Sequence, residues 1–295
     1  MDIFGIPVQA FLGQLMLGLV NGAFYAVLSL GLAIIFGIVK IVNFAHGAFF
    51  MTGAFLAFLL GRYLGIGYWP ALILVPLAVA GVGMVVERLF LRRIYGLEPI
   101  YGLLLTFGMV LVIEGGFRIA FGSSGYPYPV PEQLRGALNL GFMLLPIYRA
   151  FVIVAALVVC LATWLVIERT ALGARLRAAT EKPELTQAFG VNVPLLLTLT
   201  YGAGVGLAAF AGVLAAPIQH VNPSMGSELV IIVFAIVVIG GVGSISGAIV
   251  TGLLLGIVEG LTKVFYAEGS TVIVFLVMAL VLLLRPAGLF GREEN

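Results

Sequence analysis

Residues 31–53 read GLAIIFGIVKIVNFAHGAFFMTG, and this stretch decides the class of protein. It is apolar enough to lie in a lipid bilayer, yet it carries Lys40, Asn43 and His46 and is interrupted by four glycines. Polar side chains are costly within hydrocarbon and usually face a cavity, a partner or a water path. Glycine-interrupted membrane helices are tolerated only where protein or a cavity covers the freed backbone groups. The stretch therefore predicts a transporter rather than a membrane anchor.

The composition extends this interpretation to the whole chain. Of the 295 residues, 62% are hydrophobic and only 9% are charged, whereas a soluble domain has about 25% charged residues. The deficit of charge runs along the full length. We therefore expect an all-α, polytopic membrane protein in which residues 1–295 form a single transmembrane domain.

Apolar runs of about 20 residues, the length that crosses a bilayer as a helix, indicate about nine spans, with a range of eight to ten. Residues 32–42 either extend the first span or form a separate half-helix. Four glycines between residues 240 and 247 allow one bent span, two spans or a re-entrant pair. The candidate spans are 9–31, 43–61, 69–91, 99–121, 147–167, 193–216, 228–243, 246–266 and 270–285.

Basic residues predict the orientation of these spans. Lysine and arginine follow the third, fifth and last spans, whereas the loop after the sixth span has none. Cytoplasmic loops carry the excess of basic residues. We therefore expect the N-terminus outside and the C-terminus in the cytoplasm. The segment at about 122–146 then lies outside, and the segment at about 168–194 lies inside.

The inside segment 168–194 contains a predicted short helix over 181–189. Pro183 suits the first turn of a helix and Gly190 suits its end. Three apolar residues at helical spacing share one face, which predicts a surface for a partner. They are Leu185, Ala188 and Phe189.

Arg175 and Arg177 give the same segment a basic edge, which suits lipid headgroups or an acidic protein surface. The alternative interpretation is an ordinary positively charged inside loop with a helix lying at the membrane interface.

Catalytic and nucleotide-binding motifs are missing from the sequence. It has no G-x-x-x-x-G-K-[ST] phosphate loop, no H-E-x-x-H zinc motif and no G-x-S-x-G nucleophile turn. The one cysteine and two histidines have no metal-ligand spacing. We expect no enzyme activity, no bound cofactor or metal, and no nucleic-acid partner.

Three strings resemble the LivH-type branched-chain amino-acid permeases, which are membrane subunits of ABC importers in the LivH/LivM family. They are IVNFAHGAFFMTGAF at 41–55, VVIGGVGSISGAIVTG at 237–252 and RPAGLFG at 285–291. Urea and short-amide permeases share the architecture, so these substrates and other amino acids remain alternatives to branched-chain amino acids.

The resemblance implies a multi-subunit importer in a bacterial inner membrane. A LivM-type second permease, two ATPase subunits that bind ATP and Mg²⁺, and a periplasmic substrate-binding protein are the expected partners. The face formed by Leu185, Ala188 and Phe189, with Gly190, Arg175 and Arg177, becomes the expected contact with an ATPase.

We expect the translocation path near the glycine-interrupted segments. Asn43 and His46 lie three residues apart and either line this path or hydrogen-bond the broken backbone of their own segment. The expected path residues are Gly37, Asn43, His46, Gly47, Gly240, Gly241 and Gly243.

Two buried glutamates bear on a different class, an ion-coupled secondary transporter. Glu114 precedes Arg118 by four residues, and Glu259 precedes Lys263 by four. We expect each pair to neutralise itself along its helix. This pairing counts against proton coupling, which would use an unpaired carboxylate within the membrane.

Overall fold

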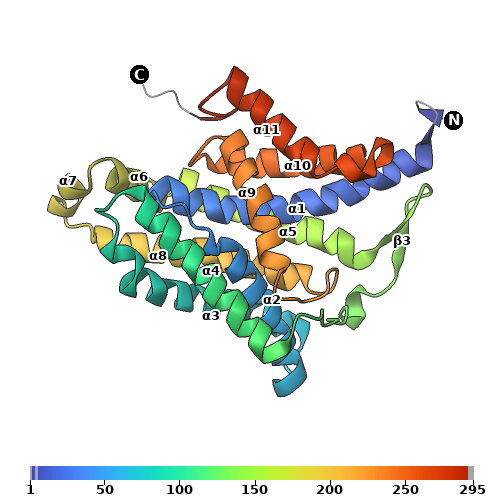
Figure 1. Cartoon of the computed structure of the whole chain (residues 1–295), viewed down its shortest axis with the longest axis horizontal. Helices are drawn as coiled ribbons and strands as arrows, with labels where there is room; N and C mark the ends of the chain where they lie inside the picture. Colours follow the sequence, from blue (N-terminus) through green and yellow to red (C-terminus); the bar gives the residue numbers. More distant parts are fainter. Residues whose placement is uncertain (1, 4–5, 292–295) are drawn as a thin grey trace.

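A computed structural model describes residues 2–3 and 6–291, and the described chain is helical apart from two short hairpins (Figure 1). The α-helices are α1 (Val8–Val39), α2 (Ala45–Leu64), α3 (Tyr68–Leu89), α4 (Pro99–Phe121), α5 (Ile147–Arg169), α6 (Ala171–Glu181), α7 (Pro183–Ala188), α8 (Val193–Ala215), α9 (Met225–Gly240), α10 (Ile245–Phe265) and α11 (Val272–Leu284). Single 3-10 turns are η1 (Leu91–Arg93), η2 (Glu132–Leu134) and η3 (Ala267–Gly269). The hairpins pair β1 (Asp2–Ile3) with β2 (Ile6–Pro7), and β3 (Ala137–Asn139) with β4 (Leu144–Pro146).

Each of the nine expected spans contains a helix, but the count of nine full spans is not confirmed. Among the described residues, seven helices are long and apolar enough to cross a bilayer. The other two, α9 with 16 residues and α11 with 13, are shorter. At 1.5 Å per residue they reach about 24 and 20 Å, less than the ~30 Å hydrocarbon core. The all-α polytopic class is confirmed.

The first helix settles the open question about residues 32–42. α1 runs unbroken for 32 residues to Val39, and its glycines do not interrupt it. The helix ends at Lys40, which has φ +57° and is the one described non-glycine residue in the left-handed region. The Lys40 amide donates to the Phe36 carbonyl at 3.1 Å. The break therefore lies at 40–44, between α1 and α2.

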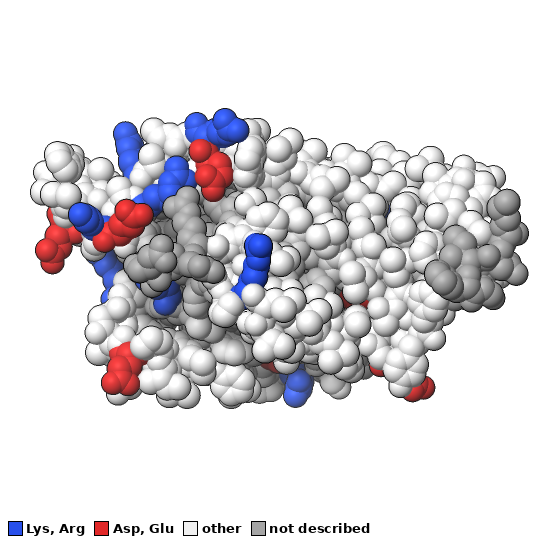
Figure 2. Space-filling model, turned by 90° about the horizontal axis from the view of Figure 1, so that it is seen from above, with Lys and Arg blue, Asp and Glu red and all other residues white. Residues whose placement is uncertain are grey.

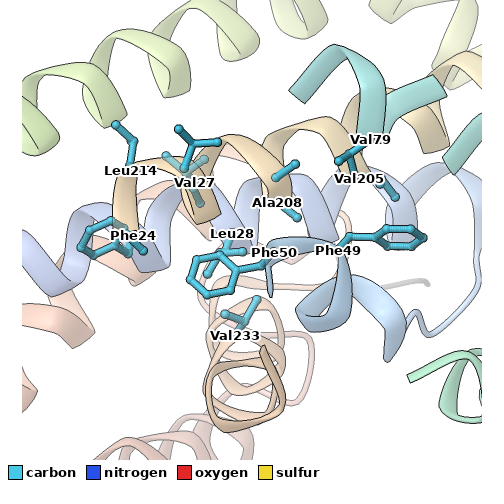
Figure 3. Close-up of a cluster of buried hydrophobic side chains, with 14 of the residues drawn as sticks. Phe24, Val27, Leu28, Phe49, Phe50, Val79, Val205, Ala208, Leu214 and Val233 are labelled. Carbon is cyan, nitrogen blue, oxygen red and sulfur yellow. The ribbon is translucent and has the colours of Figure 1, made fainter. Parts of the chain in front are cut away.

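α1 occupies the centre of the bundle, whereas α3, α4 and α5 lie at its periphery (Figure 1). Its most extensive contact is with α10, where glycines on both helices let the backbones approach closely. A β-carbon on Gly18 would lie 2.6 Å from the Gly256 carbonyl oxygen. Figure 3 shows the adjoining core, in which side chains from α1, α2, α3, α8 and α9 pack together.

Charged side chains gather at the end of the molecule formed by α6 and α7 (Figure 2). The sequence predicted one helix over 181–189, and α6 was not expected. Thr170 begins α6 by accepting a hydrogen bond from the Leu172 amide at 3.3 Å, and Pro183 begins α7. The segment 168–194 thus forms two consecutive helices between α5 and α8.

Candidate functional site

The non-helical segment 40–44 lies beside α4, which satisfies part of its backbone; Ile41 and Asn43 are buried, whereas Lys40 is exposed. The Phe44 amide donates to Thr106 Oγ1 at 3.3 Å, and the Thr106 hydroxyl donates to the Val42 carbonyl at 3.1 Å. Thr106 is fully buried. Irregular backbone among apolar helices requires such internal partners, so α4 holds the break in place.

His46 lies in the first turn of α2 and is almost fully buried. Its Nε2 lies 3.0 Å from the Leu28 carbonyl oxygen in the middle of α1. Its Nδ1 has no partner among the described residues. His46 therefore joins the start of α2 to the central helix.

Asn43 and Tyr201 form a pair of unsatisfied polar groups inside the bundle. The Tyr201 hydroxyl from α8 faces the Asn43 side chain, and both residues are fully buried. Within residues 6–291, neither the Asn43 amide nor the Tyr201 hydroxyl has a hydrogen-bond partner of good geometry. Buried polar groups are nearly always paired, so these two side chains form a polar spot within an otherwise apolar part of the bundle. The sequence analysis identified Asn43 and missed Tyr201.

Glu87 is a second buried polar group that the sequence analysis missed. It lies in the last turn of α3 and is fully buried. The Tyr95 hydroxyl donates to its Oε1 at 2.7 Å, and the Thr198 hydroxyl donates to its Oε2 at 2.6 Å. Burial raises the pKa of Tyr95 well above its usual range, and the hydrogen bond to Glu87 adds to this. Glu87 thus connects α3, the segment after η1 and α8.

The glycines expected along the path are sites of close backbone packing. A β-carbon on Gly37 would lie 2.7 Å from the Gly243 Cα, and one on Gly240 would lie 2.7 Å from the Gly247 carbonyl. Gly37 and Gly243 also border a cavity of about 230 Å³ next to Arg177. These glycines therefore set how closely α1 approaches the turn between α9 and α10, and how closely α9 approaches α10.

Gly47 packs in the same way, directly against Gly226 in α9. Gly241 has φ +96°, ends α9, and contacts the backbone of Phe290 and Gly291.

The string RPAGLFG covers the end of α9. The Leu289 amide donates to the Ile239 carbonyl at 2.8 Å, and the Phe290 amide donates to the Gly240 carbonyl at 3.2 Å. Gly288 makes the turn with φ +82°. Carbonyls at a helix end lack partners within the helix, so this segment acts as a cap from outside.

α7 presents an apolar face that nothing in the described chain covers. Phe189 is 79% exposed and Leu185 is 52% exposed, and Ala188 is exposed beside them. Gly190 has φ +83°, as expected for a residue that ends the helix.

The two arginines of the expected surface differ in their contacts. Arg177 donates to the Ile167 carbonyl at 3.2 Å and pairs with Glu168 at 3.4 Å, so it fastens α6 to the end of α5. Arg175 is exposed and has no such contact within residues 6–291.

One of the two expected ion pairs is present, and the prediction of the other is wrong. Lys263 Nζ lies 2.7 Å from Glu259 Oε1, and the Tyr25 hydroxyl donates to Glu259 Oε2 at 2.6 Å. Glu114 and Arg118 form no pair, because Glu114 is buried while Arg118 is exposed. Glu114 Oε1 has no partner among the described residues.

Long apolar helices, a break between two of them that is held inside the bundle by α4, and a charged end together define an integral membrane protein. Comparison with known proteins gives the family. The sequence profile described as the permease component of branched-chain amino acid transport systems matches residues 14–284. The chain belongs to this family and is a permease, not an enzyme.

Relatives of similar length support this assignment. The chain is 31% identical to BraD of Pseudomonas aeruginosa, a high-affinity branched-chain amino acid transport system permease protein, over 96% of this chain and 97% of BraD. It is 28% identical to LivH of Escherichia coli K12 over 96% of each protein. It is 26% identical to LivM of the same organism over 90% of this chain and 67% of LivM. No solved structure matches the chain.

Proposed function

We propose that this permease is one of two membrane subunits of an ATP-driven importer and that it carries branched-chain amino acids inward. The match of residues 14–284 to the permease family carries the proposal, and BraD and LivH, the relatives named for this transport, support it. The similarity to both LivH and LivM supports a LivM-type second subunit.

The remaining partners are two ATPase subunits, which bind ATP and Mg²⁺, and a periplasmic substrate-binding protein. The α7 face supports an ATPase contact because exposed aromatic residues commonly anchor interfaces. Leu185, Ala188 and Phe189 would enter a groove on the ATPase. Gly190 would fix the end of the helix, and Arg175 would meet the rim.

The protein lies in a bacterial inner membrane with α6 and α7 in the cytoplasm. Three arginines at the end of α3 and in η1 lie at the same end of the bundle as α6 and α7, and this excess of basic charge supports the orientation. The N-terminus and the segment 122–146 then lie on the outer side, and the C-terminus lies inside.

The translocation path passes beside the break at 40–44 and the glycine-rich turn at 240–247. Asn43 supports this placement because its buried amide lacks a partner within the described chain. A transient path suits an importer whose binding protein has already selected the substrate.

Reconstitution of the permease with its partner subunits in liposomes tests the function. We expect ATP-dependent uptake of leucine, isoleucine and valine from the loaded binding protein. Uptake of urea or short amides in preference to these amino acids would contradict the proposed substrate.

The second candidate, an ion-coupled transporter, is favoured by one observation: Glu114 is a buried carboxylate without the expected cation. Liposomes that contain this chain alone test it. Amino-acid uptake driven by a proton or sodium gradient, with no ATPase present, would replace the importer proposal.

A further inference from the structure

A cavity of about 310 Å³ with a mixed polar and apolar lining lies at the end of the bundle opposite α6 and α7. It is lined by residues of the first half of α1, the start of α5, the last turns of α10 and the segment after α8. Apolar residues such as Leu17 and Ile218 form part of its wall. Its polar lining residues are Gln14, Asn21, Arg149 and Lys263.

The two cations of this cavity are in different electrostatic situations. Lys263 is neutralised by Glu259, whose other oxygen accepts a hydrogen bond from Tyr25. Arg149 is half-buried and has no ion pair or side-chain hydrogen bond within residues 6–291. The cavity therefore carries the charge of one guanidinium that no described carboxylate balances.

The two amides of the cavity come from one face of α1. Gln14 and Asn21 are seven residues apart, which places them two turns apart on the same side of the helix. Both are half-buried, and within the described part of the chain neither side-chain amide has a hydrogen-bond partner. Two amides and one free guanidinium thus point to a ligand that accepts hydrogen bonds and carries negative charge.

We propose that this cavity is an oxyanion site that receives the carboxylate of the delivered amino acid before it reaches the buried path. Arg149 binds the carboxylate with two parallel hydrogen bonds, the geometry that a guanidinium favours. Asn21 and Gln14 orient it, and Leu17 and Ile218 contact the aliphatic side chain. The inference rests on the proposed import of amino acids, and it names the group by which they are recognised.

A lipid phosphate is the other source of the same chemistry, because α5 begins where the outer bilayer surface is expected. The substrate carboxylate is favoured by the size of the cavity. Its 310 Å³ suits a molecule as small as leucine, and its apolar wall matches an aliphatic side chain.

The test measures binding to the complete transporter without its binding protein, by saturation-transfer NMR titration. The probes are leucine, 4-methylpentanoate, which keeps the carboxylate and lacks the ammonium group, and leucinol, which lacks the carboxylate. We expect leucine and 4-methylpentanoate to bind and leucinol to bind at least tenfold more weakly, since hydrogen bonds to charged groups contribute this much.

Arg149→Gln should weaken leucine binding at least tenfold, and Arg149→Lys should restore part of it. Asn21→Leu, which leaves the charge in place, should weaken binding less and serves if Arg149→Gln does not fold. The matched control is Arg118→Gln, because Arg118 is exposed on α4 and outside the cavity. Arg118→Gln should leave leucine binding unchanged.

Equal binding of leucinol and leucine would overturn the proposal. So would an Arg149→Gln complex that keeps leucine binding and loses a co-purifying phospholipid, measured by mass spectrometry, because the site would then hold a lipid phosphate. If the Arg149→Gln complex loses the second permease subunit and shows no other change, Arg149 forms an ion pair across the subunit interface, and the proposal is also overturned. If the transporter takes up branched-chain amino acids but Arg149→Gln does not change leucine binding, the proposed site is refuted and the proposed transport stands. If uptake fails but leucine binding depends on Arg149, the proposed transport is refuted and the site stands.

Discussion

The backbone of Gly47 in α2 lies directly against the backbone of Gly226 in α9, and a β-carbon on either residue would overlap the other. This contact brings the start of α9 against the start of α2, next to the break at 40–44. The two glycines therefore determine how closely the two helices that begin inside the bundle can approach.

Gly226→Ala should lower the thermal midpoint of the detergent-solubilised protein, because overpacking a tight contact costs about 1–3 kcal/mol. Gly108→Ala on α4 is the control, since a β-carbon there would meet nothing within 4 Å. It should leave the midpoint unchanged or raise it. The midpoints are measured by fluorescence-detected size exclusion after heating. Equal thermal midpoints for the two variants would show that the Gly47–Gly226 contact can relax without loss of stability.

Phe189→Ala should release the ATPase or uncouple hydrolysis from transport, while insertion and folding are retained. An aromatic anchor commonly contributes 2 kcal/mol or more to an interface, which is roughly a thirtyfold loss of affinity. The assay is pull-down of the ATPase with solubilised permease. Ile119→Ala is the control, because Ile119 is 91% exposed on α4, far from α7.

Gly190→Val should impair the same interface by a different route. Gly190 has φ +83°, a conformation that a β-branched residue adopts only with strain. If both Phe189→Ala and Gly190→Val bind the ATPase normally, the coupling surface lies elsewhere. The segment 88–98 is then the next place to test.

Glu87→Leu should destabilise the permease by about 1–3 kcal/mol, because it leaves the Tyr95 hydroxyl without its buried acceptor and restricts the Thr198 hydroxyl to the Pro194 carbonyl of its own helix. Glu87→Gln keeps one acceptor oxygen and should cost less. Thermal midpoints of the two variants check this order. If Glu87→Leu proves as stable as Glu87→Gln, the two hydroxyls have found other partners.

Asn43→Leu should separate a structural role from a role in transport. Asn43 has no hydrogen-bond partner in the described chain, so an apolar side chain of similar size should keep or raise the thermal midpoint. If the path passes Asn43, uptake should nevertheless fall at least tenfold. Tyr201→Phe removes only the neighbouring hydroxyl and is the companion variant. A large drop in the midpoint of Asn43→Leu would instead assign this amide to the framework.

Cysteine labelling checks the orientation. In a Cys160→Ala background, Ser124→Cys should react with an impermeant thiol reagent in intact spheroplasts, and Gln187→Cys should react only after lysis. Both positions are exposed. If only Gln187→Cys is labelled in intact spheroplasts, the orientation of the protein in the membrane is the reverse of the predicted one.

Local spacing predicted those features whose cause is local. The apolar runs predicted the helices, and Pro183 and Gly190 predicted the limits of α7. Lys263 follows Glu259 by four residues and its side chain turns toward the carboxylate. The same spacing was misleading for Glu114, since Arg118 is on the exposed side of α4 and spacing alone does not determine which way a side chain turns.

Features made by distant partners could not be predicted in this way. The Thr198 hydroxyl reaches Glu87 from 111 residues away. The sequence marked the glycines of the expected path, but their role follows from the distant backbone that each one meets, such as the turn at Gly243 for Gly37. The cap on α9 likewise depends on a segment 50 residues later in the chain.

The close contact between α1 and α10 has a consequence for how the protein is made. Gly18 reaches Gly256 across 238 residues of chain, which a ribosome synthesises in about 10–50 seconds at 5–20 residues per second. During that interval the central helix is already in the membrane, and its glycine face has no final partner. Lipid or the insertion machinery must cover this face until α10 emerges, so α1 is synthesised before the other described helices and yet is among the last of them to reach its native packing.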